Sequence, residues 1–386
     1  MGKLKRTGLG LMTLLSVMVL AGCSGTSSKG ADKTSSTRSS KTVASSKKRA
    51  RTSSTATKSS STAKTDQTNA HLLLTFMGDN TMGTDPKFNA ATSLPTVWAQ
   101  HGNSPTYFFQ NVARYFQNDD LTIANLETTL TNTSTQKFKG TGTVFHFKGN
   151  PAIVKTLTAS GIEAVTVANN HIYDYGQQGF DDTIATLKGA GVGYFGEGYK
   201  YTTTVKGVKI GMLGYQGWTA TTADLTKIKT DIKELRAAGC QIVIPYFHWG
   251  IEKAPRPNAT QTTLAHAAID AGADMVIGSH PHVIESMEQY KGKLIAYSMS
   301  NFCFGGNSHP SDMRSFILQA SLNVQDGKVA GSQFKVIPTR ISSTSAYNDY
   351  QPTPYTGSEA TSVLNYMNSL SPTLNGGISN QYFRLQ

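Results

Sequence analysis

Cysteine and long apolar segments are both scarce in this sequence. Three cysteines occur among 386 residues, and the spacing of Cys240 and Cys303 gives no support for a disulfide, so we expect both to be buried thiols. One apolar run, Leu9–Ala21, follows three basic residues and is too short to cross a bilayer comfortably as a mature helix. A basic start and a short apolar run are instead typical of a secretory signal peptide.

The end of this apolar run carries a second signal. The segment Leu20-Ala21-Gly22-Cys23 resembles the lipobox of bacterial lipoproteins, in which the cysteine is diacylated and becomes the new N-terminus. We therefore expect residues 1–23 to be a lipoprotein signal peptide and Cys23 to be the lipidation site, since two acyl chains give stable anchoring. An ordinary signal peptide with a chance cysteine is the alternative. The expected location is the extracytoplasmic face of a bacterial cell membrane, with a Gram-positive cell favoured.

Acidic and apolar residues are nearly missing from residues 24–70. Of the chain's 36 basic and 24 acidic residues, 13 basic but only two acidic ones lie in residues 1–70. A segment so rich in Ser, Thr, Lys and Arg buries too little apolar surface to offset its ordering entropy, so it predicts a disordered linker. The rest of the chain is nearly neutral and does not have the charge of a nucleic-acid-binding domain. We expect no nucleic acid among its partners.

Beyond residue 70, strand-like apolar runs alternate with helical patterns. Strands are predicted at Leu72–Met77, Leu121–Ala124, Glu163–Ala168, Tyr201–Val205, Val208–Leu213, Gln241–Phe247, Asp274–Ile277, Leu294–Ser298, Ser315–Leu322 and Lys328–Ile337. Helices are predicted at Pro151–Ser160, Phe180–Lys188, Ala223–Ala238 and Thr260–Ala271. This alternation predicts an α/β domain with mixed sheets over residues 71–340. A C-terminal extension, residues 341–386 with a helix at Ser358–Leu370, should pack on or flank it.

Polar side chains follow the apolar runs at the points where strands end. They are Asp79, Glu127, Asn170 with His171, His248, and His280 with His282. Because the carboxyl ends of parallel strands meet at one edge of a sheet, these groups can converge there. Imidazole and carboxylate groups presented together are typical metal ligands. The pattern therefore predicts a metal centre.

The order of these motifs resembles that of the calcineurin-like metallophosphoesterases. Within that superfamily the details are closer to the CapA family, which includes the PgsA-type poly-γ-glutamate synthesis proteins. The matching segments are Met77–Gly83, Ala124–Thr128, Asn169–Gly176, His248–Glu252, Ile277–Val283 and Ala296–Phe302. The resemblance spans most of residues 72–304. It implies a calcineurin-like four-layer α/β/β/α sandwich, preceded by the disordered tether.

The resemblance also implies roles for the strand-end residues. Asp79 and Glu127 would be acidic ligands, with Glu127 as a bridge between two ions. The side chains implied around one ion are Asn170, His248 and His280, and His282 would serve the other. The implied cofactor is one or two divalent ions, with Mn, Fe and Zn as the candidates.

Further residues near the motifs have roles other than metal ligation. By the resemblance, His171 would act as a general acid or an oxyanion partner. Asp174 and Glu252 are either groups that orient the catalytic histidines or solvent-facing acids. Trp249 is either a packed aromatic wall or a platform that binds substrate, and Asn301 is likewise a candidate substrate-binding residue.

Two positions depart from the superfamily pattern. Metallophosphoesterases usually carry histidine two residues after the first aspartate, and here Thr81 stands in its place. The second motif is Asn125-Leu126-Glu127 instead of a Gly-Asp pair, so that Asn125 could replace Glu127 as ligand. One metal site is therefore short of a ligand.

Two functions from different classes are open. One is a metal-dependent hydrolase that acts on phosphoester or amide bonds in an envelope polymer or its precursors. The other is a non-catalytic accessory subunit of capsule or poly-γ-glutamate synthesis, which binds an anionic polymer beside a membrane-bound synthase or exporter. In both cases the expected partners are the membrane, reached through the lipid anchor, and an anionic envelope polymer.

Overall fold

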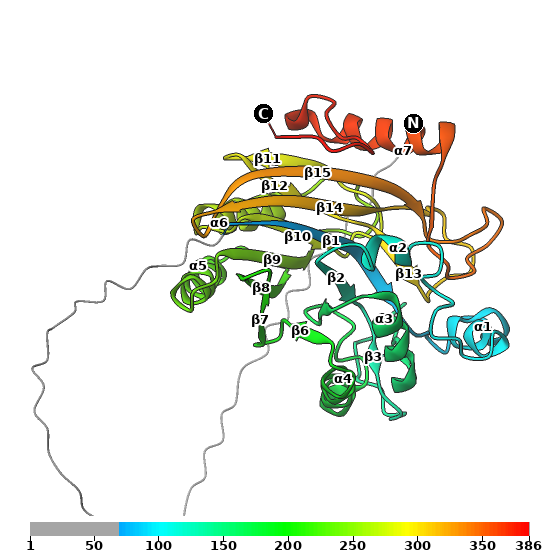
Figure 1. Cartoon of the computed structure of the whole chain (residues 1–386). Coiled ribbons are helices and arrows are strands. Elements are labelled where there is room, and N and C mark those ends of the chain that lie inside the picture. The colour runs from blue at the N-terminus through cyan, green and yellow to red at the C-terminus, as the bar shows by residue number, and fades with distance from the viewer. Residues whose placement is uncertain (1–68, 386) are drawn as a thin grey trace, which may run out of the picture. The chain divides into compact units, whose positions relative to one another are not determined.

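Two mixed β-sheets form the centre of the fold. The computed structural model describes residues 69–385, and the expected signal peptide, Cys23 and most of the linker lie outside them. The larger sheet contains β1 (Ala70–Thr81), β2 (Leu121–Leu126), β5 (Ala164–Thr166), β6 (Gly193–Phe195), β13 (Asn301–Phe304), β14 (Arg314–Gln325), β15 (Lys328–Arg340) and β16 (Thr353–Pro354). Its order is β16-β15-β14-β1-β2-β5-β6, with β13 beside β1. Figure 1 labels β15, β14, β1, β2, β6 and β13 of this sheet.

The smaller sheet packs face to face with the larger one. It contains β7 (Lys200–Val205), β8 (Val208–Gly217), β9 (Ile242–Trp249), β10 (Met275–Ser279), β11 (Met287–Tyr290) and β12 (Lys293–Ala296), in the order β11-β12-β10-β9-β8-β7. Strands β8, β9, β10 and β12 are parallel, as are β1, β2, β5 and β6 in the larger sheet. A two-stranded pair, β3 (Thr129–Leu130) with β4 (Lys148–Gly149), lies beside them.

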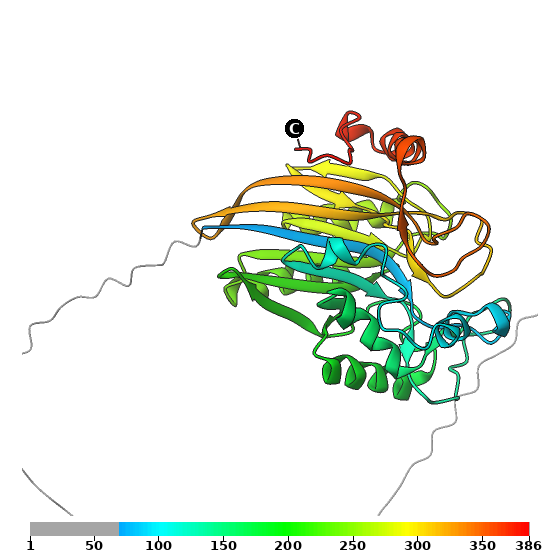
Figure 2. The same ribbon diagram turned by 45° about the vertical axis from the view of Figure 1, so that its right-hand side comes forward.

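Helices cover the outer face of each sheet. The larger sheet is covered by residues of α1 (Leu94–Gln100), α2 (Ala113–Phe116), α3 (Lys155–Ser160), α4 (Gly176–Ala190) and the 3-10 helix η2 (Pro151–Val154). A further 3-10 helix, η1 (Ala90–Thr92), precedes α1 and has no buried residue. The smaller sheet is covered by α5 (Thr222–Ala237) and α6 (Ala259–Asp270). The result is the expected four-layer α/β/β/α sandwich (Figure 2).

Three apolar clusters match these layers. Alternate residues of the central strand, Leu72, Leu74 and Phe76, join the core between the two sheets, whereas Met77 faces the helices of the larger sheet. Cys303 lies in that helix-facing cluster and Cys240 in the cluster under α5 and α6; both are buried and unpaired. None of the helices within residues 69–385 has the length and apolar character that crossing a bilayer requires.

The C-terminal segment closes one side of the inter-sheet core. Helix α7 (Gly357–Leu370) lies along β15, whose neighbour β16 is only two residues long, and the 3-10 helix η3 (Pro372–Leu374) contacts the edge strand β11 (Figure 1). The Met287 N–H of β11 donates to Ser371 Oγ at 2.9 Å, and the Phe334 N–H of β15 donates to the Phe383 carbonyl at 2.8 Å. Val363 of α7 packs into the core between the sheets. These contacts satisfy edge groups that would otherwise be open to pairing with another chain.

Candidate metal centre

The predicted ligands converge where the parallel strands of both sheets end. Asp79 lies near the end of β1, Glu127 directly follows β2, and His248 is the second-last residue of β9. His280 and His282 follow β10. Two separate sheets thus contribute to one cluster, which explains why ligands distant in sequence become neighbours.

The backbone around the cluster is tightly constrained. A Cβ atom on Gly78 would lie 1.9 Å from the Ser300 carbonyl oxygen. Only glycine therefore permits β1 to lie this close to the backbone of Ser300. His280 and His282 adopt positive φ angles of 101° and 56°. Non-glycine residues rarely adopt such angles, and they persist where the surroundings hold them. The His280 N–H provides such a restraint by donating to Asp79 Oδ2 at 3.1 Å.

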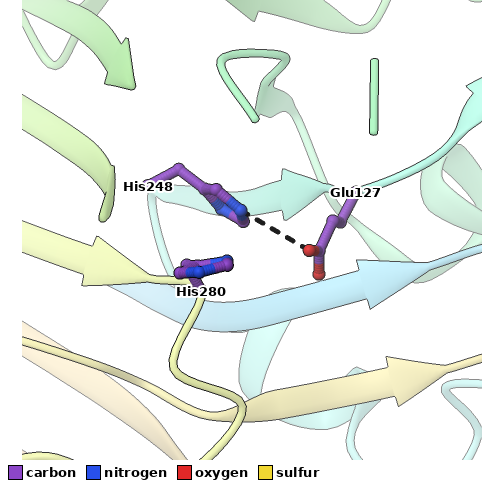
Figure 3. A group of neighbouring side chains, drawn as sticks. All are labelled: Glu127, His248 and His280. Carbon is purple, nitrogen blue, oxygen red and sulfur yellow. Dashed lines mark ion pairs between the residues drawn. The ribbon is translucent and has the colours of Figure 1, made fainter. Parts of the chain in front are cut away.

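Glu127 is the most unusual residue of the cluster. Its side chain is fully buried, and neither carboxylate oxygen has a hydrogen-bond partner within the described chain. Oε1 lies 3.5 Å from His248 Nε2 and 3.7 Å from His282 Nε2, and Figure 3 shows the carboxylate facing the rings of His248 and His280. A buried carboxylate normally requires a donor or a cation. The position is therefore suited to a positive ion.

His248 is oriented by two asparagines. Asn125 Nδ2 lies 3.1 Å from His248 Nδ1 and donates to Asp79 Oδ1 at 2.7 Å. On the other side of the ring, Nε2 lies 2.7 Å from Asn170 Oδ1. Without an ion, an Asn125 amide that donates to Nδ1 leaves the hydrogen on Nε2, directed at Asn170. An ion bound at Nε2 would have to displace this hydrogen to Nδ1. Asn125 therefore connects and positions the candidate ligands Asp79 and His248. The acidic ligand of the second motif is Glu127, which lies in the ligand groups.

His282 is positioned by Asn301. Its Nδ1 lies 2.8 Å from Asn301 Oδ1 and 3.4 Å from Asp79 Oδ2. With Nδ1 donating its hydrogen to Asn301, loss of the second proton would leave an Nε2 lone pair directed toward Glu127, free for an ion. Such a partner fixes both the tautomer and the ring orientation of a metal-binding histidine. The geometry assigns Asn301 a positioning contact with His282.

The candidate ligands form overlapping groups. The described residues contain three groups whose donor atoms lie within 4.8 Å of one another, namely Glu127–His248–His280, Asp79–Glu127–His282 and Glu252–His280–His282. The first two share Glu127, as expected for a bridging carboxylate. His280 Nδ1 is also buried without a hydrogen-bond partner. Carboxylates, imidazoles and the Asn170 amide oxygen fit a divalent transition metal.

Electrostatic coupling within the cluster is strong. Burial, reinforced by the charge of Asp79, raises the pKa of Glu127 well above its usual value. Burial disfavours the charged form of His282, but the carboxylates of Glu127 and Asp79 outweigh it and raise its pKa to about 10. Burial and the positive charge of His282 lower the pKa of His280 to about 4. A proton on His282 thus balances the buried acids, and a cation would take over that role.

His171 belongs to a second group beside the ligands. Its Nδ1 lies 2.7 Å from Asp174 Oδ2, and Asp174 is completely buried. Asp174 also accepts from the Phe147 N–H at 2.7 Å and from Lys139 Nζ at 2.6 Å. This arrangement gives Asp174 the orienting role. Lys139 was not predicted, because it comes from the irregular segment between β3 and β4, where the sequence carries no periodic signal.

The remaining predicted residues take different positions. Glu252 is exposed, in the loop after β9, and lies in one of the ligand groups with His280 and His282. Trp249 is fully buried, stacks on Phe247 with ring centroids 4.3 Å apart and donates its Nε1 hydrogen to the Tyr297 carbonyl. Trp249 is therefore placed as a packed aromatic residue of the core, and not as a platform open to a substrate. It has no surface to offer a substrate.

Thr81 occupies the position of the expected histidine. It is fully buried, and its Oγ1 has no hydrogen-bond partner in the described chain. It lies two residues after Asp79, at the end of β1. The group of Asp79, Glu127 and His282 therefore has no fourth protein ligand at this position.

Comparison with known proteins identifies relatives. The family described as "Bacterial capsule synthesis protein PGA_cap" matches residues 73–306. The capsule biosynthesis protein CapA of Bacillus anthracis is 30% identical over 258 residues, which cover 61% of this chain and 60% of that protein. The PGA biosynthesis protein CapA of Bacillus subtilis (strain 168) is 33% identical over 253 residues, which cover 60% of this chain and 63% of that protein. The chain thus spans less than two thirds of the length of these curated relatives.

One solved structure illustrates how distant the structural likeness is. A phosphatase from Mycoplasma pneumoniae aligns with 70% of this chain and 94% of its own, with 14% identity and a TM-score of 0.43. A likeness of this degree has no bearing on function.

Proposed function

The chain belongs to the family of bacterial capsule synthesis proteins described as PGA_cap, and on that premise we propose that it takes part in the synthesis of a capsule-like or poly-γ-glutamate-type polymer. The names of the two Bacillus relatives support this process. Within it, we propose a metal-dependent hydrolase centre that acts on phosphoester or amide bonds of the polymer or its precursors.

The observation that carries this proposal is the unpartnered carboxylate of Glu127. Both of its buried oxygens are without donors, and two groups of candidate ligands share it. One ion would be held by Glu127, His248 and His280 with Asn170, and another by Asp79, Glu127 and His282. A divalent ion such as Mn, Fe or Zn would act there as a Lewis acid on a substrate oxygen.

His171 is the candidate proton carrier. The Asp174 carboxylate accepts from Nδ1 and fixes the ring, so that Nε2 is free to hold or release a proton. Burial lowers the pKa of His171 although Asp174 opposes that shift. A neutral, oriented imidazole of this kind can exchange a proton with a substrate oxygen. The residue is separate from the ligand groups, so its role can be tested independently.

Metal analysis of the purified full chain tests the centre. We expect one or two equivalents of a transition metal in the wild type and loss of metal in a variant carrying His280→Ala and His282→Ala. The matched control is His309→Ala, because His309 is an exposed histidine outside the ligand groups. Turnover of a model phosphoester should fall with the metal. Unchanged metal content in the double variant would refute the metal centre.

A non-catalytic accessory role is the second candidate, and Thr81 favours it. With a buried threonine where a ligand is expected, the site could bind an anionic polymer without cleaving it. In both roles we propose that a lipid on Cys23 anchors the protein at the extracytoplasmic face of the membrane, beside a polymer synthase or exporter. Co-purification with membrane proteins would support the accessory role. Phosphoester turnover by the protein alone would count against it.

A further inference from the structure

Trp218 lies directly against two candidate metal ligands. It follows β8, and its ring meets the His280 ring edge-on with centroids 4.8 Å apart. The His248 ring lies at 5.8 Å, again nearly perpendicular. Although it contacts these buried histidines, Trp218 keeps 43% of its surface exposed. It is therefore an aromatic side chain that borders both the metal centre and solvent.

The orientation of this ring is fixed by a chain of hydrogen bonds. Trp218 Nε1–H donates to Gln216 Oε1 at 3.0 Å, and Gln216 Nε2–H donates to Glu197 Oε1 at 2.8 Å. Glu197 adopts a left-handed φ of 49°, which its surroundings must hold. Because the indole N–H is already used, only the carbon surface of the ring is left for a ligand.

A packing role does not account for this residue. The other two tryptophans, Trp98 and Trp249, are buried in apolar clusters with 7% and 0% exposure. Trp218 belongs to none of the three core clusters. A large aromatic surface exposed at a site of buried polar groups is typical of ligand contact.

We propose that Trp218 is the substrate-contacting aromatic of this centre and packs against a C–H-rich face of the unit next to the reacting group. This inference rests on the proposed function, and it adds that the substrate of the centre has a C–H-rich face beside its reacting group. Two polymers present such a face: a γ-linked glutamate chain, through its paired methylene groups, and a polysaccharide, through the C–H face of its sugar rings. The carboxylates of either polymer would point away from the indole carbon surface.

Intrinsic fluorescence of the full chain tests the inference without requiring turnover. Since Trp98 and Trp249 are buried, a ligand that covers Trp218 should shift the wild-type emission to shorter wavelength. The probes are a γ-linked glutamate oligomer and an anionic oligogalacturonate, each added to protein loaded with Mn²⁺. We expect one probe to produce the shift, which identifies the source of the C–H face.

Two variants connect that signal to Trp218. Trp218→Ala should abolish the shift and weaken binding of the probe by roughly three- to tenfold, the range of a single aromatic contact, while metal content is retained. Tyr382→Ala is the matched control, because Tyr382 is 45% exposed and contacts none of the ligands. It should bind the probe like the wild type.

The outcomes separate this inference from the proposed function. If metal-loaded Trp218→Ala binds the probe as tightly as the wild type, or if the metal-loaded wild type binds neither probe, the inference is overturned and the metal centre stands. If the wild type takes up no ion, the proposed function fails, and the inference that rests on it fails too.

Discussion

His248 Nε2 lies 3.5 Å from Glu127 Oε1, in a pair in which both side chains are completely buried. The distance is too long for a strong hydrogen bond, and burial lowers the pKa of His248 well below its usual value. The pair is therefore not a stabilising ion pair. It has the geometry of two ligands that face a common point.

Glu127→Gln should change metal binding and metal-free stability in opposite directions. Glutamine keeps the shape but removes a buried acid that has no donor, so the free energy of unfolding of the metal-free protein should rise by about 1 kcal/mol. Metal affinity should fall at least tenfold, because the shared ligand is lost. Urea denaturation with chelator and a metal titration measure the two effects.

The control for stability is Glu252→Gln. Glu252 is exposed, and replacing it should change the metal-free stability by less than about 0.5 kcal/mol. A metal-free Glu127→Gln protein that is clearly less stable than the wild type would show that the carboxylate is satisfied without a cation.

Thr81→His should supply the missing ligand. Thr81 lies two residues after Asp79 on β1, and we expect an imidazole there to join the group that contains Glu127 and His282. We expect the second equivalent of metal to bind more tightly, at a cost of about 1–3 kcal/mol in metal-free stability from overpacking. Thr81→Val, which removes only the unpartnered hydroxyl, should leave metal stoichiometry unchanged. Equal stoichiometry and affinity in both variants would argue against a second ion.

Strand ends were predictable from the sequence because local patterns define them. The run Leu72–Met77 predicted a strand, and β1 spans Ala70–Thr81; the predicted helix Thr260–Ala271 matches α6, Ala259–Asp270. In both sheets the carboxyl ends of parallel strands meet, so residues that follow apolar runs converge.

Contacts that depend on the path of loops were not predictable. Lys139 reaches Asp174 from a segment without apolar periodicity, and Trp218 reaches His280 from the turn after β8. The sequence around Lys139 and Trp218 has no motif or periodicity that predicts these contacts. Trp249, in contrast, directly follows the motif residue His248, yet its side chain faces the helices that cover the smaller sheet. The alternation of side chains across β9 explains this, because neighbours of His248 point to the opposite face.

Asp174→Asn should lower turnover without removing metal. Asp174 fixes His171 and is not in a ligand group, so metal stoichiometry should equal that of the wild type. Phosphoester turnover should fall about 10- to 100-fold, as expected when a histidine loses its orienting partner. Asp181→Asn is the matched control, because Asp181 is an exposed acid of α4 that bonds Gln177. Loss of metal in Asp174→Asn would instead place Asp174 in the metal site.

Glu285 gives a stability effect that depends on pH. Its side chain is 1% exposed, Oε2 accepts from Gln261 Nε2 at 2.7 Å, and Oε1 has no partner. Burial raises its pKa to about 8, although the Gln261 contact opposes the shift. Between the unfolded value of about 4.3 and the folded value, the folded protein holds a proton that the unfolded chain releases. The free energy of unfolding should therefore fall as pH rises across this window.

Glu285→Gln should flatten that part of the stability profile. The amide keeps the Gln261 contact and cannot ionise, so the variant should gain on the order of 2 kcal/mol over the wild type between pH 5 and 8. Below about pH 3.5 the advantage should vanish, because wild-type Glu285 is then protonated both in the folded state and in most of the unfolded chain. Chemical denaturation at several pH values measures it, with the exposed Glu359→Gln as control. Parallel profiles for wild type and Glu285→Gln would mean that Glu285 ionises in the folded protein as easily as in the unfolded chain, for example through a solvent path to Oε1.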